Sequence, residues 1–272
     1  MSKLKQIYAI PYVAWLLLFV IAPVLLIIYQ SFFDISGHFT LANYATYFTS
    51  GKYLMMTLNS IWYAFLITLT TLLISYPTAY FLTKLRHKDL LLLLIILPTW
   101  INLLLKAYAF IGIFGIHGSI NQFLSFFGIA PVQIMFTDFS FMTVATYIEL
   151  PFMILPIHSV LIKIDKHAIE AAQDLGANGF QVFRRIIFPL SIPGIVSGIT
   201  MVFMPSVTTF AISDILSGRK ISLMGNLIEN QFVRQDNWHL GSAISIILIV
   251  LIFASMIFTS KYEKENEGGG LF

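Results

Sequence analysis

A few charged side chains lie inside otherwise apolar stretches of this 272-residue chain, and they are its best candidates for chemistry. Glu149 and Asp214 offer carboxylates that could attract a cation, whereas Lys106 would repel one. A charge in an apolar stretch is costly, so it usually faces a cavity or a partner. We therefore predict that both acids line a pathway. Two alternatives remain for Lys106: a structural partner of Glu149 or Asp214, or a side chain that reaches the outer interface.

Aromatic residues accompany these charges. Ammonium groups bind the faces of aromatic rings, and four rings share the apolar stretches with the acids: Trp100, Tyr108, Tyr147 and Phe210. Any single one of them would by default face lipid or the membrane interface. Together with the two acids they suggest a weak pathway for a cation, and weak binding suits a pathway that must release what it passes.

The sequence lacks the residue patterns of metal sites, phosphate-binding loops and nucleic-acid-binding surfaces. The six histidines are scattered singly and there is no cysteine, so no metal site is predicted. Gly51-Lys52 is followed by Tyr53 and lacks the upstream glycine of a phosphate-binding loop. No run of basic residues alternates with aromatic ones, so nucleic acid is not an expected partner. We predict neither an enzyme nor a bound cofactor.

The composition indicates where these side chains lie. The chain is 58% hydrophobic and 11% charged, with a mean hydropathy of +0.84, whereas soluble domains carry about 25% charged residues. This balance predicts a helical protein that crosses a membrane several times. We expect one domain over residues 1–272, with six spans near 7–30, 57–82, 90–112, 139–162, 192–214 and 241–260.

The basic residues orient these spans. Eleven lysines and arginines flank one side of the predicted spans and four (Lys52, Arg219, Lys220 and Arg234) lie on the other. Basic residues concentrate in cytoplasmic loops. Both termini and the loop at about 163–191 are therefore predicted to be cytoplasmic.

That loop contains a short amphipathic pattern. It runs Glu170-Ala171-Ala172, three residues, Gly176, nine residues, then Ile186-Ile187-Phe188-Pro189. The stretch 167–175 is rich in helix formers, and Gly176 is a natural C-cap. Glu170 and Asp174 share a face, and two small alanines permit close approach of another protein. Arg184 and Arg185 could anchor the acidic face or meet lipid phosphates.

This pattern resembles the EAA loop of permease subunits in ATP-driven importers. The resemblance implies a coupling helix that docks on an ATPase through Glu170, Ala171, Ala172, Asp174 and Gly176. Phe188 stands where the family usually has leucine.

Further motifs resemble the PotB-type permeases of spermidine/putrescine importers. They extend from about residue 55 to 260 and include Leu97-Pro98 with Trp100, Lys106-Ala107-Tyr108, Leu150-Pro151-Phe152-Met153, Phe203-Met204-Pro205-Ser206, Ser213-Asp214 and Asp236-Asn237-Trp238. The expected fold is all-α: a type I ABC importer transmembrane domain with six transmembrane helices and a cytoplasmic coupling helix.

The resemblance also implies partners in a bacterial inner or plasma membrane. These are a PotC-like second permease, a dimeric PotA-like ATPase that carries ATP and Mg, and an extracellular PotD-like polyamine-binding protein. The substrate would be a polyamine, and the lipid bilayer surrounds the spans. Another small solute remains an alternative.

The predicted fifth span contains a candidate hinge and a candidate packing motif. Pro205 in its middle is our candidate hinge, and Gly194-x3-Gly198 has the spacing of close helix packing, at the place where such permeases pair. A self-sufficient secondary transporter would need coupling-ion sites and often inverted repeats, and the sequence offers neither.

Overall fold

The regular structure of this chain is helical. The computed structural model describes the backbone of residues 3–268 and the side chains of residues 10–257, and this part contains helices and one isolated bridge between Phe33 and Phe39. Within it, six stretches are long and apolar enough to cross a membrane: Ile10–Phe32, Gly51–Leu82, Leu103–Phe126, Asp138–Leu161, Gly179–Thr208 and Trp238–Ile257. The predicted all-α class with six candidate spans is therefore confirmed.

Three helices form the centre of the bundle. They are α4 (Gly51–Leu82), α8 (Asp138–Leu161) and α11 (Phe188–Thr208), and α8 packs extensively on both of the others. In α8, 56% of the most apolar window is buried, whereas in Ile10–Phe32 none of it is. α8 is thus the core helix, and the first span presents its apolar surface outward.

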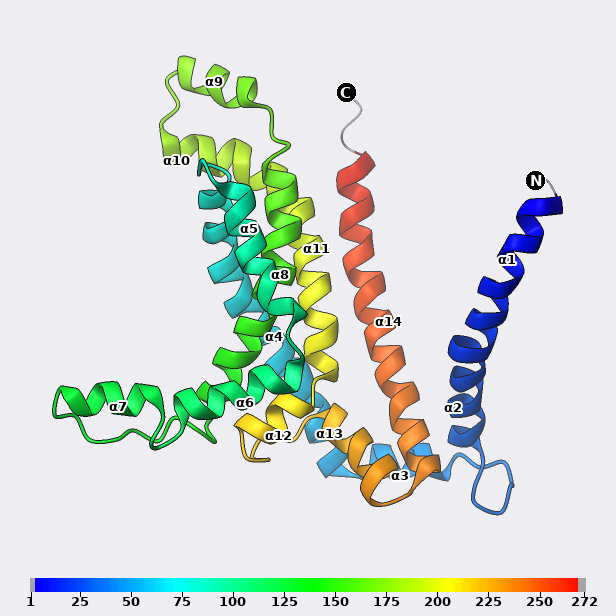
Figure 1. Ribbon diagram of the computed structural model, residues 1–272. Helices are drawn as coiled ribbons and strands as arrows, with labels where there is room; N and C mark the ends of the chain where they lie inside the picture. The colour runs from blue at the N-terminus through cyan, green and yellow to red at the C-terminus, as the bar shows by residue number, and fades with distance from the viewer. Residues whose placement is uncertain (1–2, 269–272) are drawn as a thin grey trace.

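The first span stands at the edge of the bundle. It consists of α1 (Lys3–Leu16), the π-helical η1 (Leu17–Ile21) and α2 (Ala22–Phe32). Among the described contacts α2 packs on α14 (Trp238–Gly268), which in turn packs on α11. Figure 1 shows α14 between the central helices and α2. The outward surface of the first span therefore needs lipid or another chain to cover it.

Glycines bring α11 and α8 into close contact. A Cβ at Gly194 would lie 2.9 Å from the Pro156 carbonyl oxygen, and one at Gly198 would lie 2.6 Å from Met153 Sδ. Such distances leave no room for a larger side chain, so the Gly194-x3-Gly198 spacing serves packing inside this chain. The expectation that it pairs with a second permease is wrong for these two glycines.

The predicted third span, 90–112, is not one helix. The chain forms α5 (Lys88–Ile96), a 3-10 turn η2 (Leu97–Trp100), and then α6 (Leu103–Phe114) and α7 (Ser119–Phe126). Pro98 favours the tight turn, and the Asn102 side chain accepts the Leu104 N–H at 2.9 Å to start a new helix. In Figure 1, α5 runs along the bundle, whereas α6 and α7 lie across its lower end.

The predicted fifth span, 192–214, extends too far. α11 ends at Thr208, Thr209 is extended, and a separate helix α12 (Ala211–Leu216) follows. Asp214 is therefore outside the long helix. Pro205 lies in the last turn of α11, where its carbonyl accepts the Thr208 hydroxyl at 2.9 Å, and its predicted mid-span position is wrong.

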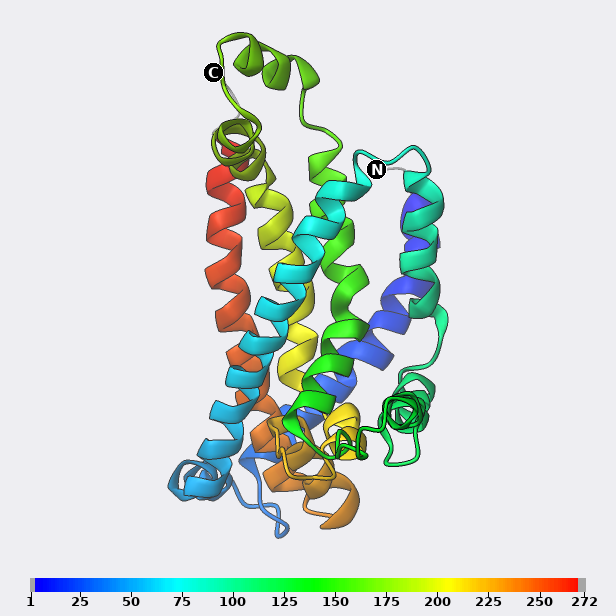
Figure 2. The ribbon, with the colours of Figure 1, turned by 90° about the vertical axis from the view of Figure 1, so that its left-hand side faces the viewer.

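The loops divide between the two ends of the bundle. One end carries three short helices: α9 (Lys166–Asp174), α10 (Gly179–Val182) and the π-helical η3 (Phe183–Ile187). The start of α1 and the end of α14 lie at the same end of the bundle (Figures 1 and 2). At the other end lie α3 (Ala42–Thr49), α7, α12, α13 (Met224–Glu229) and the π-helical η4 (Asn230–Arg234).

Candidate functional site

The predicted coupling helix exists as α9 and stands away from the bundle (Figure 1). Asp165 begins it by accepting the His167 N–H at 2.9 Å, a cap that the sequence analysis did not consider. Gly176 follows its end with φ +85°, the left-handed conformation that a C-terminal glycine supplies. No residue of α9 is buried. Ile169 and Ala172 are partly buried against the core of the bundle, and the helix is held at both ends and presents its other residues to the surroundings.

The exposed surface of this loop is more apolar than the sequence analysis recognised. Leu175 is 90% exposed and Phe180 is 71% exposed. Glu170 lies on α9 with its carboxylate 3.5 Å from His167 Nδ1. A capping box between Asn178 and Gln181, with both bonds at 2.9 Å, fixes the turn that carries Phe180. Leu175 and Phe180 are apolar residues in an otherwise polar loop, and this pattern in the sequence already indicated an exposed apolar surface.

Arg184 and Arg185 do not anchor the acidic face of α9. Both are exposed in η3, and among the described side chains no ion pair joins either of them to an acid. Of the two expectations for these arginines, contact with lipid phosphates stays a prediction.

Glu149 lies in α8 in an unusual environment. Its Oε2 is buried and has no hydrogen-bond partner among the described residues. Lys106 of α6 is close enough to interact with it electrostatically, although the two do not form an ion pair within 4.0 Å. A buried oxygen without a partner costs about 1–3 kcal/mol. The Glu149 carboxylate is therefore only partly compensated and could accept a passing cation or water.

A cavity of about 260 Å³ lies beside this pair, and both Lys106 and Tyr147 line it. Its other walls are mostly apolar and come from α4, α5, η2 and α8, including Leu94, Pro98 and Leu150. Lys106 and Tyr147 thus line the same cavity. The pathway hypothesis requires Tyr147 to face a cavity, and it does.

Trp100 and Tyr108 do not join this cavity. Trp100 is 78% exposed in η2 and Tyr108 is 57% exposed on α6. Residues two apart on a helix point in different directions, so Tyr108 faces away from the side on which Lys106 lines the cavity. In this arrangement the two rings are open to lipid or to a partner chain.

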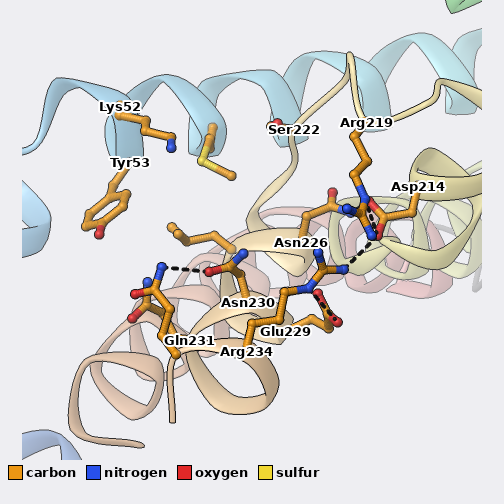
Figure 3. A pocket seen from close by; sticks show the side chains of 13 residues that line it. Lys52, Tyr53, Asp214, Arg219, Ser222, Asn226, Glu229, Asn230, Gln231 and Arg234 are labelled. Atoms are coloured by element: carbon orange, nitrogen blue, oxygen red, sulfur yellow. Dashed lines mark hydrogen bonds and ion pairs between the residues drawn. The ribbon is translucent and has the colours of Figure 1, made fainter. Parts of the chain in front are cut away.

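Asp214 lines a different cavity, of about 210 Å³, whose walls come from α4, α12, α13 and η4 (Figure 3). Its Oδ1 accepts the Asn226 amide at 2.7 Å, and its Oδ2 lies 3.8 Å from Arg219 Nε and 3.7 Å from an Arg234 guanidinium nitrogen. Arg234 also lies 3.5 Å from Glu229. The Asp214 carboxylate is thus already matched by two cations.

This second cavity shares no lining residue with the first. Phe210 contacts its network through its carbonyl, which accepts the Asn226 amide at 3.2 Å. The structure therefore separates the six predicted pathway residues: Tyr147 lines the first cavity, Glu149 lies in α8 outside that lining, Phe210 and Asp214 share a network, and Trp100 and Tyr108 are exposed. The single pathway that joins Asp214 to Glu149 is not formed in this conformation.

Sequence reasoning missed Arg219 and Arg234 as partners of Asp214, although a signal was present. Lys52, Arg219, Lys220 and Arg234 were the four exceptions to the positive-inside pattern. Three of them line the cavity of Asp214, and Lys220 donates to the Phe136 carbonyl at 3.0 Å. Three of the four basic residues on the predicted outer side thus bind acids or a carbonyl in the folded chain. Among the described residues, no group of three or more His, Cys, Asp or Glu could hold a metal.

The sequence of this chain is similar to that of known transport proteins. Residues 53–265 match the family described as binding-protein-dependent transport system inner membrane component. The spermidine/putrescine transport system permease protein PotB of Haemophilus influenzae is 38% identical, over 98% of this chain and 95% of that protein. PotB of Escherichia coli K12 is 41% identical, over 88% of this chain and 90% of that protein.

The fold also resembles a solved structure. A crystal structure of a bacterial ABC transporter that imports the acidic polysaccharide alginate contains a chain with a TM-score of 0.76 to this one. The match covers 96% of both chains at 17% identity. This likeness concerns the fold alone.

Proposed function

Because the chain belongs to the binding-protein-dependent transport system inner membrane components, and among them to the PotB-type permeases, we propose that it is the permease subunit of a polyamine importer. The observation that carries the substrate class is the identity of about 40% to PotB proteins along nearly the whole chain. The substrate is spermidine, putrescine or both.

The subunit is a transporter component and provides half of a translocation pathway. A PotC-like permease supplies the other half, a PotA-like dimer binds and hydrolyses ATP with Mg, and an extracellular PotD-like protein delivers the polyamine. What supports this assembly is the family of the chain and the outward apolar surface of the first span, which leaves a large area for a second permease or lipid.

The coupling role falls to α9. ATP binding closes the ATPase dimer, α9 follows it, and the two permeases rock between inward-open and outward-open states. Glu170, Ala171, Ala172, Asp174 and Gly176 form the contact, and the exposed Leu175 and Phe180 add apolar anchors to it. In the proposed topology α9 and both termini are cytoplasmic, as the distribution of basic residues indicates.

Tyr147, in the lining of the 260 Å³ cavity, and Glu149, close to Lys106, are proposed pathway residues, and Lys106 offsets part of the Glu149 charge between passages. Trp100 and Tyr108 remain proposed pathway residues in another conformation. Asp214 and Phe210 act differently: their network with Arg219 and Arg234 holds the outer end together. Pro205, one turn before the break at Thr209, stays the proposed hinge.

Uptake of radiolabelled spermidine and putrescine tests this function, in cells that lack the subunit and in the same cells with the wild-type gene restored. We expect uptake to be lost and then recovered. If deletion leaves polyamine uptake unchanged, the polyamine assignment is wrong and a permease for another small solute takes its place.

A further inference from the structure

The largest described cavity near the coupling helix has no part in the proposed pathway. It measures about 430 Å³ and lies between α9–η3 and the adjoining ends of α4, α5 and α8. Leu161, Ile164, Ile169, Val182 and Ile187 line it with apolar surface. An apolar cavity at the boundary of the spans is suited to an acyl chain.

Three lysines line the same cavity: Lys84, Lys88 and Lys166. Among the described side chains, none of them forms an ion pair with a carboxylate within 4.0 Å. The Lys84 ammonium lies 4.2 Å from the centre of the Tyr80 ring, which holds it at the cavity. These cations therefore differ from Arg219 and Arg234, which acids already match.

The acids of this region are engaged or exposed elsewhere. Asp165 accepts the His167 N–H at 2.9 Å, and Glu170 lies 3.5 Å from His167. Asp89 is exposed and does not line the cavity. The lining residues thus carry three positive charges and no negative one.

We propose that this lysine-rimmed cavity binds an anionic phospholipid, with the phosphate on Lys84, Lys88 and Lys166 and an acyl chain along the apolar wall. The inference uses the proposed topology, which puts this end at the cytoplasmic leaflet, where basic pockets between helices bind acidic headgroups. Charge complementarity and the apolar wall together favour a lipid over a small phosphate ion.

The position of the cavity gives such a lipid a consequence. Lys166 and Ile169 belong to α9, whereas Lys84 lies in the turn after α4 and Leu161 is the last residue of α8. A lipid that contacts both groups would link the coupling helix to the spans. Binding would therefore limit the movement of α9 relative to α4 and α8.

The test uses the whole transporter, purified with its partner subunits and exchanged into phosphatidylcholine with or without phosphatidylglycerol. Native mass spectrometry counts the retained phosphatidylglycerol in the wild type and in the triple variant Lys84→Gln, Lys88→Gln, Lys166→Gln. Each lysine near an anionic surface contributes about fivefold in affinity, so the triple variant should bind about a hundredfold more weakly. The matched control Lys52→Gln, Arg86→Gln, Lys163→Gln removes the same charge from exposed positions outside the cavity and should retain the lipid.

A second measurement locates the lipid. The chain has no native cysteine, so Gln173→Cys supplies a single thiol in the lining of the cavity. Phosphatidylglycerol, but not phosphatidylcholine, should slow its modification by a soluble thiol reagent. Equal lipid loss in both triple variants, protection by inorganic phosphate alone, or protection by the assembled ATPase without lipid would each overturn the proposal. None of these readouts involves polyamine, so they are independent of the proposed substrate.

Discussion

The two carboxylates that the sequence places in apolar stretches have opposite surroundings. Glu149 has a buried oxygen without a hydrogen-bond partner, whereas Asp214 contacts two guanidinium groups and an amide. A transported cation gains most at a carboxylate that is not already matched. At the scale of single residues, Glu149 is therefore the better candidate for contact with the substrate, and Asp214 the better candidate for stability.

Glu149→Gln should lower polyamine uptake while leaving the protein folded. The change keeps the shape of the side chain and removes one favourable charge interaction, which corresponds to about tenfold in rate. Removing a poorly solvated charge should leave the thermal midpoint unchanged or raise it. Uptake assays with equal amounts of membrane-inserted protein measure the first effect, and thermal unfolding of the purified transporter measures the second. Wild-type uptake by this variant would remove Glu149 from the pathway.

Asp214→Asn should instead destabilise the outer end. It leaves Arg219 and Arg234 without their shared partner, at a cost of about 1 kcal/mol for this partly exposed cluster and a fall of about 2–4 °C in the thermal midpoint. Glu229→Gln is the matched control, because Glu229 pairs with Arg234 alone among the described residues. Its effect should be smaller. Equal effects from both variants would mean that Asp214 is not the centre of the network.

Helix ends decide which elements the sequence could predict. The coupling helix was predictable because Gly176 and the helix formers before it have local signals. The break at Asn102 and the end of α11 at Thr208 were missed, because apolar sequence resumes directly after each short interruption, although a cap and a tight turn end the helix there. The Asp214 network was hidden for another reason: it joins residues up to twenty positions apart, in the three short helices α12, α13 and η4 and the loop after α12.

Gly176→Ala isolates the role of the coupling-helix end. A Cβ at Gly176 would have no neighbour within 4 Å, so the cost arises from its φ of +85° alone. That conformation costs a non-glycine residue about 1–2 kcal/mol. We expect lower uptake and weaker stimulation of ATP hydrolysis by substrate, with unchanged assembly of the two permeases.

Gly179→Ala is the control for this prediction. Gly179 is also free of neighbours within 4 Å, and its φ is not positive. The variant should behave as the wild type in both assays. A loss of coupling in Gly179→Ala as large as in Gly176→Ala would mean that any change in the loop disturbs docking, and the conformational argument would fail.

Gly194→Ala tests the packing of α11 on α8. The new methyl group would meet the Pro156 carbonyl oxygen at 2.9 Å and Ile157 Cα at 3.0 Å, and neither backbone atom can move without shifting α8. We expect a loss of about 1–3 kcal/mol in stability, measured by thermal unfolding. Gly112→Ala in α6 has open space around it and should be neutral. Gly198→Ala should cost less than Gly194→Ala, because its nearest neighbour is the flexible end of Met153.

Across the whole molecule, the distribution of charge and the arrangement of the helices agree. The eleven basic residues on the predicted cytoplasmic side flank the end of the bundle that carries α9, and three of the four exceptions line one cavity at the opposite end. Ion pairs with Asp214 and Glu229 offset the cost of two of these exceptions, Arg219 and Arg234. A count of charges thus predicts the orientation in the membrane, whereas the positions of the exceptions are seen only in the folded structure.

The orientation itself can be measured because the chain has no cysteine of its own. Ala171→Cys places one thiol on exposed α9, and Ser36→Cys places one in the exposed loop before α3, at the opposite end of the bundle. A membrane-impermeant thiol reagent added to intact cells, with the outer membrane made permeable where there is one, should label Ser36→Cys and spare Ala171→Cys. Inverted vesicles should give the reverse, since each reagent reaches only the side it is added to. Labelling of Ala171→Cys from outside would invert the topology, and would at once remove α9 from the reach of a cytoplasmic ATPase and the lysine-rimmed cavity from the inner leaflet.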